Sequence, residues 1–117
     1  MAITEAFQNS NASWGTEYFL AAASTSQGSG QADDGVYQLM LDLSALADGD
    51  EYRVRVWDAI SSTGTVRIIS EWVLAHAQSE PLWVTPSLIL LHKWDFSVTC
   101  LAGTNSRSIA WSIRKVA

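Results

Sequence analysis

The stretch "LDLSALADGDEYRVRVWD", residues 41–58, decides the fold of this 117-residue chain. Its second half alternates with a period of two, which divides the side chains into one set of Tyr52, Val54 and Val56 and an opposite set of Arg53, Arg55 and Trp57. Such alternation is typical of a β-strand with one buried face. Residues 36–43 alternate in the same way and place on one side Tyr37, Leu39, Leu41 and Leu43.

Three acidic residues, Asp48, Asp50 and Glu51, surround Gly49 between these two runs. They suggest either a metal-binding loop or a turn. An EF-hand loop needs ligands at alternating positions and a bidentate glutamate at its twelfth position, and this spacing is absent. Asp-Gly between two alternating runs is instead a hairpin signal, because both residues tolerate positive φ. We therefore predict a turn between paired strands, lengthened by an irregular step at "LSAL", and no metal site.

Period-two alternation continues along the rest of the chain, in residues 66–75, 94–100 and 107–116. Ser70 interrupts the first of these runs, so we expect a bulge there. In "PLWVTPSLILL", Pro86 confines its position to an edge, a strand start or a bend between two strands. Residues 16–24 are a weaker strand candidate, because their alanines also suit a helix.

The segments that join these runs are rich in glycine, serine, asparagine and aspartate, the residues that favour turns. Seven to eight strands at such spacings predict an all-β fold, an antiparallel β-sandwich or jelly roll, over residues 16–117. No alternation of strands with helices occurs, so we do not expect a parallel sheet.

Residues 1–15 stand apart, because Ile3, Phe7 and Trp14 are apolar anchors spaced through polar residues. This composition suits an extended N-terminal arm that lies on another surface. The alternative is a first edge strand with a frayed end.

Charge and composition limit the partners. The formal net charge is −5, and the seven basic residues are scattered, which argues against a nucleic-acid partner. The longest apolar run is "LILL", residues 88–91, far short of the roughly 20 residues that span a bilayer. No membrane partner is therefore expected. A single cysteine, Cys100, and a start without secretory features agree with folding in a reducing cytoplasm.

No catalytic constellation is predicted. His76, His92 and Cys100 lack the further ligands that zinc needs and the third group that orients a nucleophile's base. Cys100 shares its predicted face with Trp94, Phe96 and Val98, which indicates a core thiol. We therefore expect no enzyme, no cofactor, no metal and no catalytic residue.

Six tryptophans are the unusual feature of the composition. Parity places Trp72, Trp94 and Trp111 in the core. The other three, Trp14, Trp57 and Trp83, fall on outward faces or irregular segments. Exposed aromatic rings suit a protein interface or a carbohydrate platform, although the arm or a loop could also cover them.

Two segments, "LDLSALADGDEYRVRVWD" and "AHAQSEPLWVTPSLILLHKWDFSVTCLAGTNSRSIAWSIRKV", resemble a group of small structural proteins of tailed bacteriophages. An "LDLS.L..GD" step, an "A.AQ..P....P" connection and a "GWD....AGT.R...W.I" ending recur in that group. The resemblance covers residues 35–116, and Lys93 stands where the pattern has glycine. These are loop and core signatures, so they imply a virion component.

The resemblance implies a capsid cement or decoration protein, assembled in the bacterial cytoplasm and located on the capsid surface. Its partner would be the major capsid protein, and the chain would form a homo-oligomer, a dimer or a trimer. We expect the contacts first at Ile3, Phe7 and Trp14 and second at Arg53, Arg55 and Trp57. The alternative is a tail or fibre component that recognises host glycans through exposed tryptophans.

Overall fold

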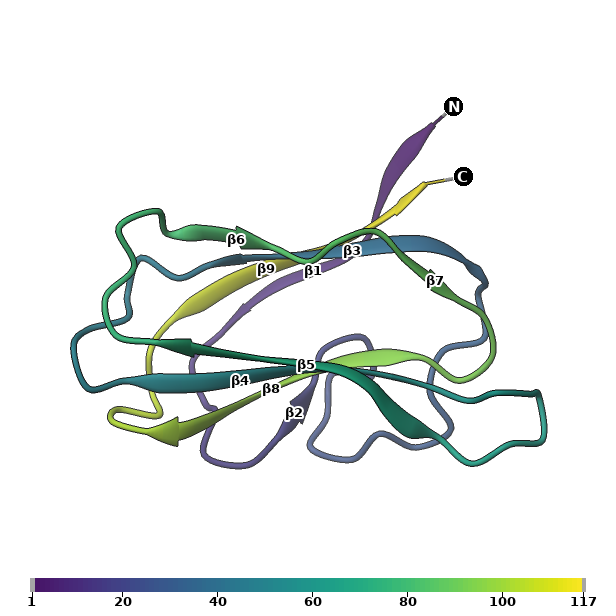
Figure 1. Cartoon of the computed structure of the whole chain (residues 1–117), viewed down its shortest axis with the longest axis horizontal. Helices are drawn as coiled ribbons and strands as arrows, with labels where there is room; N and C mark the ends of the chain where they lie inside the picture. Colours follow the sequence, from purple (N-terminus) through teal and green to yellow (C-terminus); the bar gives the residue numbers. More distant parts are fainter. Residues whose placement is uncertain (1, 117) are drawn as a thin grey trace.

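The computed structural model describes residues 2–116 as two antiparallel sheets built from nine strands (Figure 1). In order, the first sheet contains β1 (Ile3–Asn11), β9 (Ile109–Val116), β3 (Gly35–Asp42) and β6 (Leu82–Val84), with β7 (Leu88–Leu90) also paired to β3. The second contains β2 (Tyr18–Phe19), β8 (Asp95–Ala102), β4 (Glu51–Asp58) and β5 (Arg67–Ala75). The described residues form no helix, and so none that is long and apolar enough to cross a bilayer.

The core lies between the two layers, and strand parity determines which side chains enter it. The predicted inward sets are confirmed in β3, β4 and β9, where the following are buried: Tyr37, Leu39, Leu41, Tyr52, Val54, Val56, Ile109, Trp111 and Ile113. Trp94 lies at the centre, with its ring 4.2 Å from that of Tyr37 and edge-on to Phe7 and Phe96. Trp72, also predicted in the core, is only half-buried.

The connection between β3 and β4 corrects the predicted hairpin. The two strands lie in different sheets, so residues 43–50 cross from one layer to the other. Leu43 and Leu46 are buried between the layers, and this burial explains why the chain crosses there instead of folding back beside β3. A turn does occur at Asp48 and Gly49, whose φ is 93°. The prediction of a turn was right, and that of paired strands was wrong.

Two local predictions are confirmed at the sheet edges. Pro86 separates β6 from β7, which pair with opposite ends of β3. The Thr85 hydroxyl bridges the gap by accepting the Leu39 N–H at 3.1 Å. In β5 the pairing shifts, because Val56 faces Ser70 whereas Trp57 faces Ile68. The extra residue is Ile69, next to the predicted position.

The weak strand predicted over residues 16–24 shrinks to the two residues of β2. The Asp95 carboxylate accepts the N–H groups of Ala21 and Ala22 at 2.9 and 3.0 Å. These donors are therefore used in a turn and cannot extend the ladder with β8.

The extended N-terminal arm is not confirmed. β1 pairs with β9 from Ile3 opposite Val116 to Asn11 opposite Ile109, so it is an edge strand of the first sheet, as in the alternative. Nearly every residue of this segment lies opposite β9, which satisfies its backbone polar groups better than a free arm would. The predicted arm, residues 1–15, and the predicted sandwich, residues 16–117, each include one residue outside the described part of the chain, Met1 and Ala117.

Candidate functional site

The acidic turn is a structural clamp. The buried Asp50 carboxylate accepts the N–H groups of Ala47 and Thr104, both at 2.9 Å, and pairs with Arg107 Nε at 2.7 Å. These backbone donors, and then Arg107, lower the pKa of Asp50 to about 2. The β3–β4 connection is thereby tied to the β8–β9 loop. Gly103, at φ 81°, is required in that loop, because a Cβ there would collide with the Asp50 carboxylate.

Two further buried carboxylates hold loops in the same way. Asp58 accepts the N–H groups of Leu91, His92 and Lys93 at 2.9 to 3.1 Å. Burial raises the pKa of Asp58, but its backbone donors together outweigh burial, so the net direction is downward. Asp95 is more deeply buried, and burial raises its pKa to about 6 against the opposing effect of its N–H donors.

His76 and Cys100, two of the candidate catalytic or metal-binding residues, have structural partners. His76 Nδ1 accepts the Gly49 N–H at 3.1 Å, and the half-buried Cys100 Sγ lies 3.1 Å from the Ala102 carbonyl oxygen. Across residues 2–116, no three His, Cys, Asp or Glu side chains gather in a group that could hold a metal ion.

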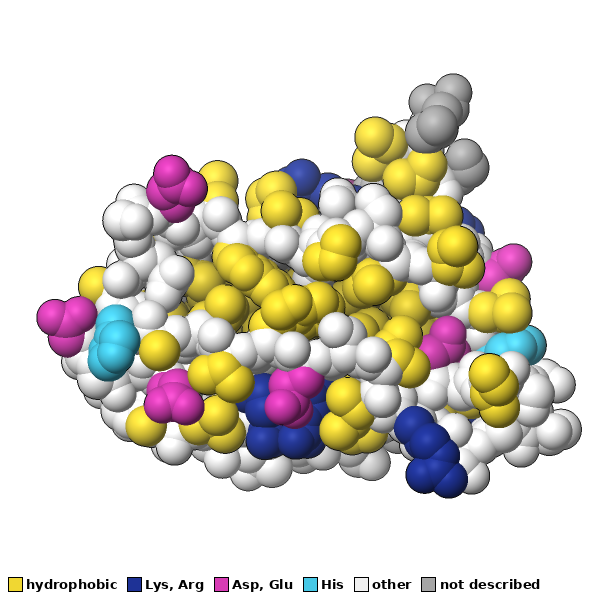
Figure 2. Space-filling model, viewed as in Figure 1, with side chains coloured by type: hydrophobic (Ala, Val, Ile, Leu, Met, Phe, Trp, Pro, Cys, Tyr) yellow, Lys and Arg dark blue, Asp and Glu magenta, His cyan; other side chains and the backbone are white. Residues whose placement is uncertain are grey.

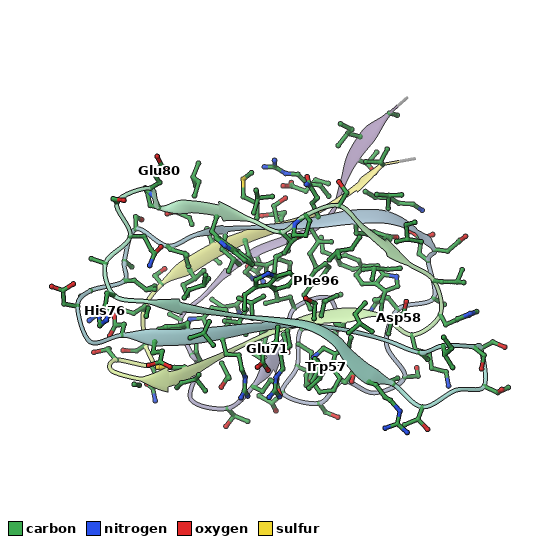
Figure 3. All side chains as sticks on the ribbon, in the orientation of Figure 1. Trp57, Asp58, Glu71, His76, Glu80 and Phe96 are labelled. Atoms are coloured by element: carbon green, nitrogen blue, oxygen red, sulfur yellow. The ribbon has the colours of Figure 1, made fainter. Side chains whose placement is uncertain are left out.

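The second group of predicted contact residues does come together, on the outer face of the second sheet. Arg55 pairs with Glu71 at 2.6 Å and with Glu17 at 3.5 Å, and Arg53 lies 3.9 Å from Glu71. The Arg55 guanidinium also lies 5.9 Å from the centre of the Trp57 ring. Figure 3 labels Trp57 and Glu71 on this face. Its charges are matched within the chain, so the face is fixed and close to neutral.

Trp57 is fixed in this network by a hydrogen bond and an aromatic contact. Its Nε1–H donates to the Ser97 hydroxyl at 2.8 Å, and that hydroxyl donates to Glu17 at 2.6 Å. Its ring packs against Phe19, with 5.7 Å between the ring centres. The indole is half-buried, so only part of it is available to a partner.

The first group of predicted contacts is divided by the structure. Ile3 is exposed on β1, whereas Phe7 is half-buried with its ring 6.1 Å from that of Trp94. Trp14 is fully buried, donates from Nε1 to the Arg107 carbonyl at 2.8 Å and packs edge-on to Tyr18. Its predicted placement on a partner surface is corrected, because the segment after β1 lies beside β8, where the Cys100 N–H donates to the Trp14 carbonyl oxygen at 2.8 Å.

The exposed Ile3 belongs to an apolar row that crosses the outer face of the first sheet. Direct register pairs join Ile3 to Val116, Val116 to Val36, and Val36 to Ile89. We call these four residues the apolar row. Ile89 is 81% exposed. Ile89 belongs to the apolar row only because β7 pairs with β3, and the sequence does not show which strands pair.

The same face carries a second apolar group near its other end. Met40 lies opposite Val84, and beside them a shallow hollow of about 150 Å³ is lined partly by Leu82, Ala110 and Trp111. A polar row of Glu5, Arg114 and Gln38 separates this group from the apolar row. This face therefore presents two apolar groups with hydrogen-bonding side chains between them.

A larger cleft, of about 510 Å³, lies at the hairpin between β4 and β5. Its lining is mainly apolar, includes the basic side chain of Arg67, and comprises Asp58, Ala59, Ile60, Thr65, Arg67, Ile68 and Ile69. The Asp58 carboxylate is occupied by backbone donors, as described above, so it is not available as a base. The cleft suits apolar contact rather than acid–base chemistry.

Comparison of the chain with protein-family models, curated proteins and solved structures finds no match in any of the three. The fold itself defines the class of the chain, which is an all-β protein of two antiparallel sheets.

Proposed function

We propose that this chain is a non-enzymatic virion component of a tailed bacteriophage, a cement protein that binds the major capsid protein. The observation that carries the proposal is the apolar row together with the Met40 and Val84 group, which make one sheet face suited to docking on a protein surface. The chain would assemble with the capsid in the host cytoplasm and remain on the capsid surface.

We also propose that the fold is a jelly roll. If β6 and β7 count as one strand interrupted at Pro86, there are eight strand positions. The first then pairs with the eighth, the second with the seventh, the third with the sixth and the fourth with the fifth. This nested pairing is that of an antiparallel ribbon rolled into two sheets. Jelly rolls occur in viral capsid proteins and in lectins, although a fold alone does not define a function.

Cementing would work by burial of the exposed row. Moving apolar surface out of water contributes about 25 cal/mol per square ångström, and the part that exceeds the cost of association appears as affinity. Binding between the folded chain and the assembled capsid lattice also stabilises both of them, because it requires the chain to be folded and the lattice to be assembled. Ile3 and Ile89 are the main contacts in this proposal, and the neutral face with Arg53, Arg55 and Trp57 is a second one.

A tail or fibre component that recognises host glycans remains the alternative, because jelly rolls include lectins. A glycan platform needs open aromatic rings, and all six tryptophans are buried or half-buried. The capsid role is therefore favoured. The copy number of the chain in purified particles, measured on a quantitative gel, separates the two roles, because cement is present in far more copies than a tail protein.

We expect Ile89→Asp to weaken binding to cement-free capsid shells at least tenfold, because the change removes apolar contact and places a charge in the interface. The measurement is co-sedimentation of the purified chain with shells over a concentration series. The control is Ile60→Asp on the β4–β5 hairpin, whose isoleucine is 96% exposed. Equal binding of both variants and the parent chain would contradict the proposal. Deleting residues 2–14 is a poorer test, because it removes β1 and the buried Trp14.

A further inference from the structure

The four edges of the two sheets differ in how well they are protected against pairing. β2 has only two residues, and the β6–β7 edge is broken at Pro86. β1 has a pairing irregularity between Glu5 and Phe7 and is otherwise mostly polar. β5 is different, because it has nine residues, contains no proline and exposes Ile68, Ile69 and Val73. A long apolar edge is a template for another strand.

The regular part of the β5 edge is bounded at both ends. At its start, the bulge at Ile69 disturbs the pairing geometry. At its end, Gln78 Nε2 donates to the Ala75 carbonyl oxygen at 2.8 Å and to the His76 carbonyl oxygen at 3.2 Å. Residues 70–74 therefore form an open stretch of five residues, enough for a short two-stranded ladder.

The surface beside this open stretch is apolar. Figure 1 shows β5, β6 and β7 on the near side of the two layers, and Figure 2 shows hydrophobic side chains in a band between them. Trp72 of β5 and Trp83 of β6 meet edge-on across the two sheets, with 5.5 Å between ring centres, and both are half-buried. We call this side, formed by the open edges of β5, β6 and β7, the lateral face.

The lateral face is large enough for a stable interface. The molecule measures 40 × 31 × 20 Å, and the lateral face is seen along the shortest axis, so it extends over the two longer dimensions. A standard interface buries about 800 Å² on each partner. The side of the molecule that carries the lateral face is broad enough for a contact of this size, and the apolar band runs along it.

Charge does not oppose self-association of β5. If two copies of the strand pair antiparallel about Trp72 or Val73, Glu71 lies opposite Val73 or Ala75 of the other copy and never opposite another Glu71. Each Glu71 is also matched within its own chain by Arg55 at 2.6 Å. Glu71 therefore brings little repulsion to the interface.

We propose that the lateral face binds the same face of a second copy, with the two β5 strands pairing antiparallel about a two-fold axis. The second sheet of each copy then continues across the dimer, and the Trp72–Trp83 bands cover each other. An isologous contact of this kind closes after two subunits. The inference specifies the oligomer of the proposed function, but it does not depend on the capsid role.

The test is the mass of the purified full chain by sedimentation velocity from about 1 to 100 μM, with hydrogen exchange of the β5 amides, since an interface of standard size gives micromolar or tighter affinity. We expect twice the monomer mass of 12.8 kDa and protection of residues 70–74 that increases with concentration. Val73→Lys should raise the dissociation constant at least tenfold, because lysine on an edge strand opposes pairing. The control is Leu101→Lys on β8, since Leu101 and Val73 are 44% and 51% exposed.

Three outcomes would overturn the inference: a monomer with unprotected β5 amides, a trimer, or a dimer that Leu101→Lys weakens as much as Val73→Lys does. Circular dichroism melts of both variants establish that each is folded. Shell binding by a monomeric chain would leave the capsid role intact and reject only the dimer. A dimer that does not bind shells would support the dimer and reject the capsid role.

Discussion

Asp50→Ala is expected to lower the melting temperature of the chain by on the order of 10 °C, because it removes the buried acceptor shared by two backbone N–H groups and Arg107. The carboxylate satisfies the N–H groups of Ala47 and Thr104 and neutralises Arg107. Arg107 is 30% exposed and can regain water, so most of the loss comes from the two N–H groups that no longer have their acceptor. The measurement is thermal unfolding followed by circular dichroism at pH 7.

The neighbouring Asp48 provides the matched control. It lies two residues away in the same turn and is exposed, and its side chain makes no hydrogen bond or ion pair within residues 2–116, so Asp48→Ala should change the melting temperature by no more than about 2 °C. If the two variants have the same melting temperature, Asp50 does not clamp the two loops.

The stabilisation by the Asp50 clamp also depends on pH. Because the pKa of Asp50 is lowered to about 2, its contribution is present above about pH 4 and is lost as the pH falls toward 2.

The pattern of apolar residues was sufficient to predict most of the core. Parity in β3, β4 and β9 identified inward faces because each of these strands is buried on one side only. The pattern was less informative in β8, where Asp95, Ser97 and Thr99 are buried as well as the apolar residues between them. The sequence of β8 alternates as if one face were exposed, but both faces are covered at Asp95–Thr99, so parity alone does not reveal what covers the polar face.

Contacts between segments that are distant in the sequence could not be predicted from the sequence alone. The apolar row joins Ile3 to Ile89 only because β9 and β3 lie between β1 and β7. The clamp of Asp50 likewise requires the β8–β9 loop to approach the β3–β4 connection, and an Asp-Gly turn looks the same with or without that approach. Trp14 was misplaced because the polar residues around it indicated an exposed segment, whereas Trp14 itself is inserted into the core.

The unfolding free energy is expected to fall by about 3 kcal/mol as the pH rises from 4 to 7, because of Asp95. Burial raises the pKa of this carboxyl in the folded chain to about 6, whereas its ordinary value is 3.8. Between these values the unfolded chain has released the proton and the folded chain still holds it, so rising pH favours unfolding. Since Asp50 loses its contribution below about pH 4, the stability maximum should lie near pH 4 to 5.

Urea unfolding at pH 4.5 and pH 7 measures the difference, and Asp95→Asn tests its origin. The Ala21 and Ala22 amides donate to different oxygens of Asp95, and asparagine keeps the size of the side chain and one of these two acceptors. Asparagine does not titrate, so the fall between the two pH values should disappear. The exposed Asp34 provides the control, because Asp34→Asn removes a carboxylate and should leave the fall unchanged. A parent chain whose stability stays constant or rises over this range would contradict the assignment, as would an Asp95→Asn variant that keeps the fall. The buried carboxylate would then be ionised throughout, and its backbone donors would outweigh its burial, as they do at Asp58.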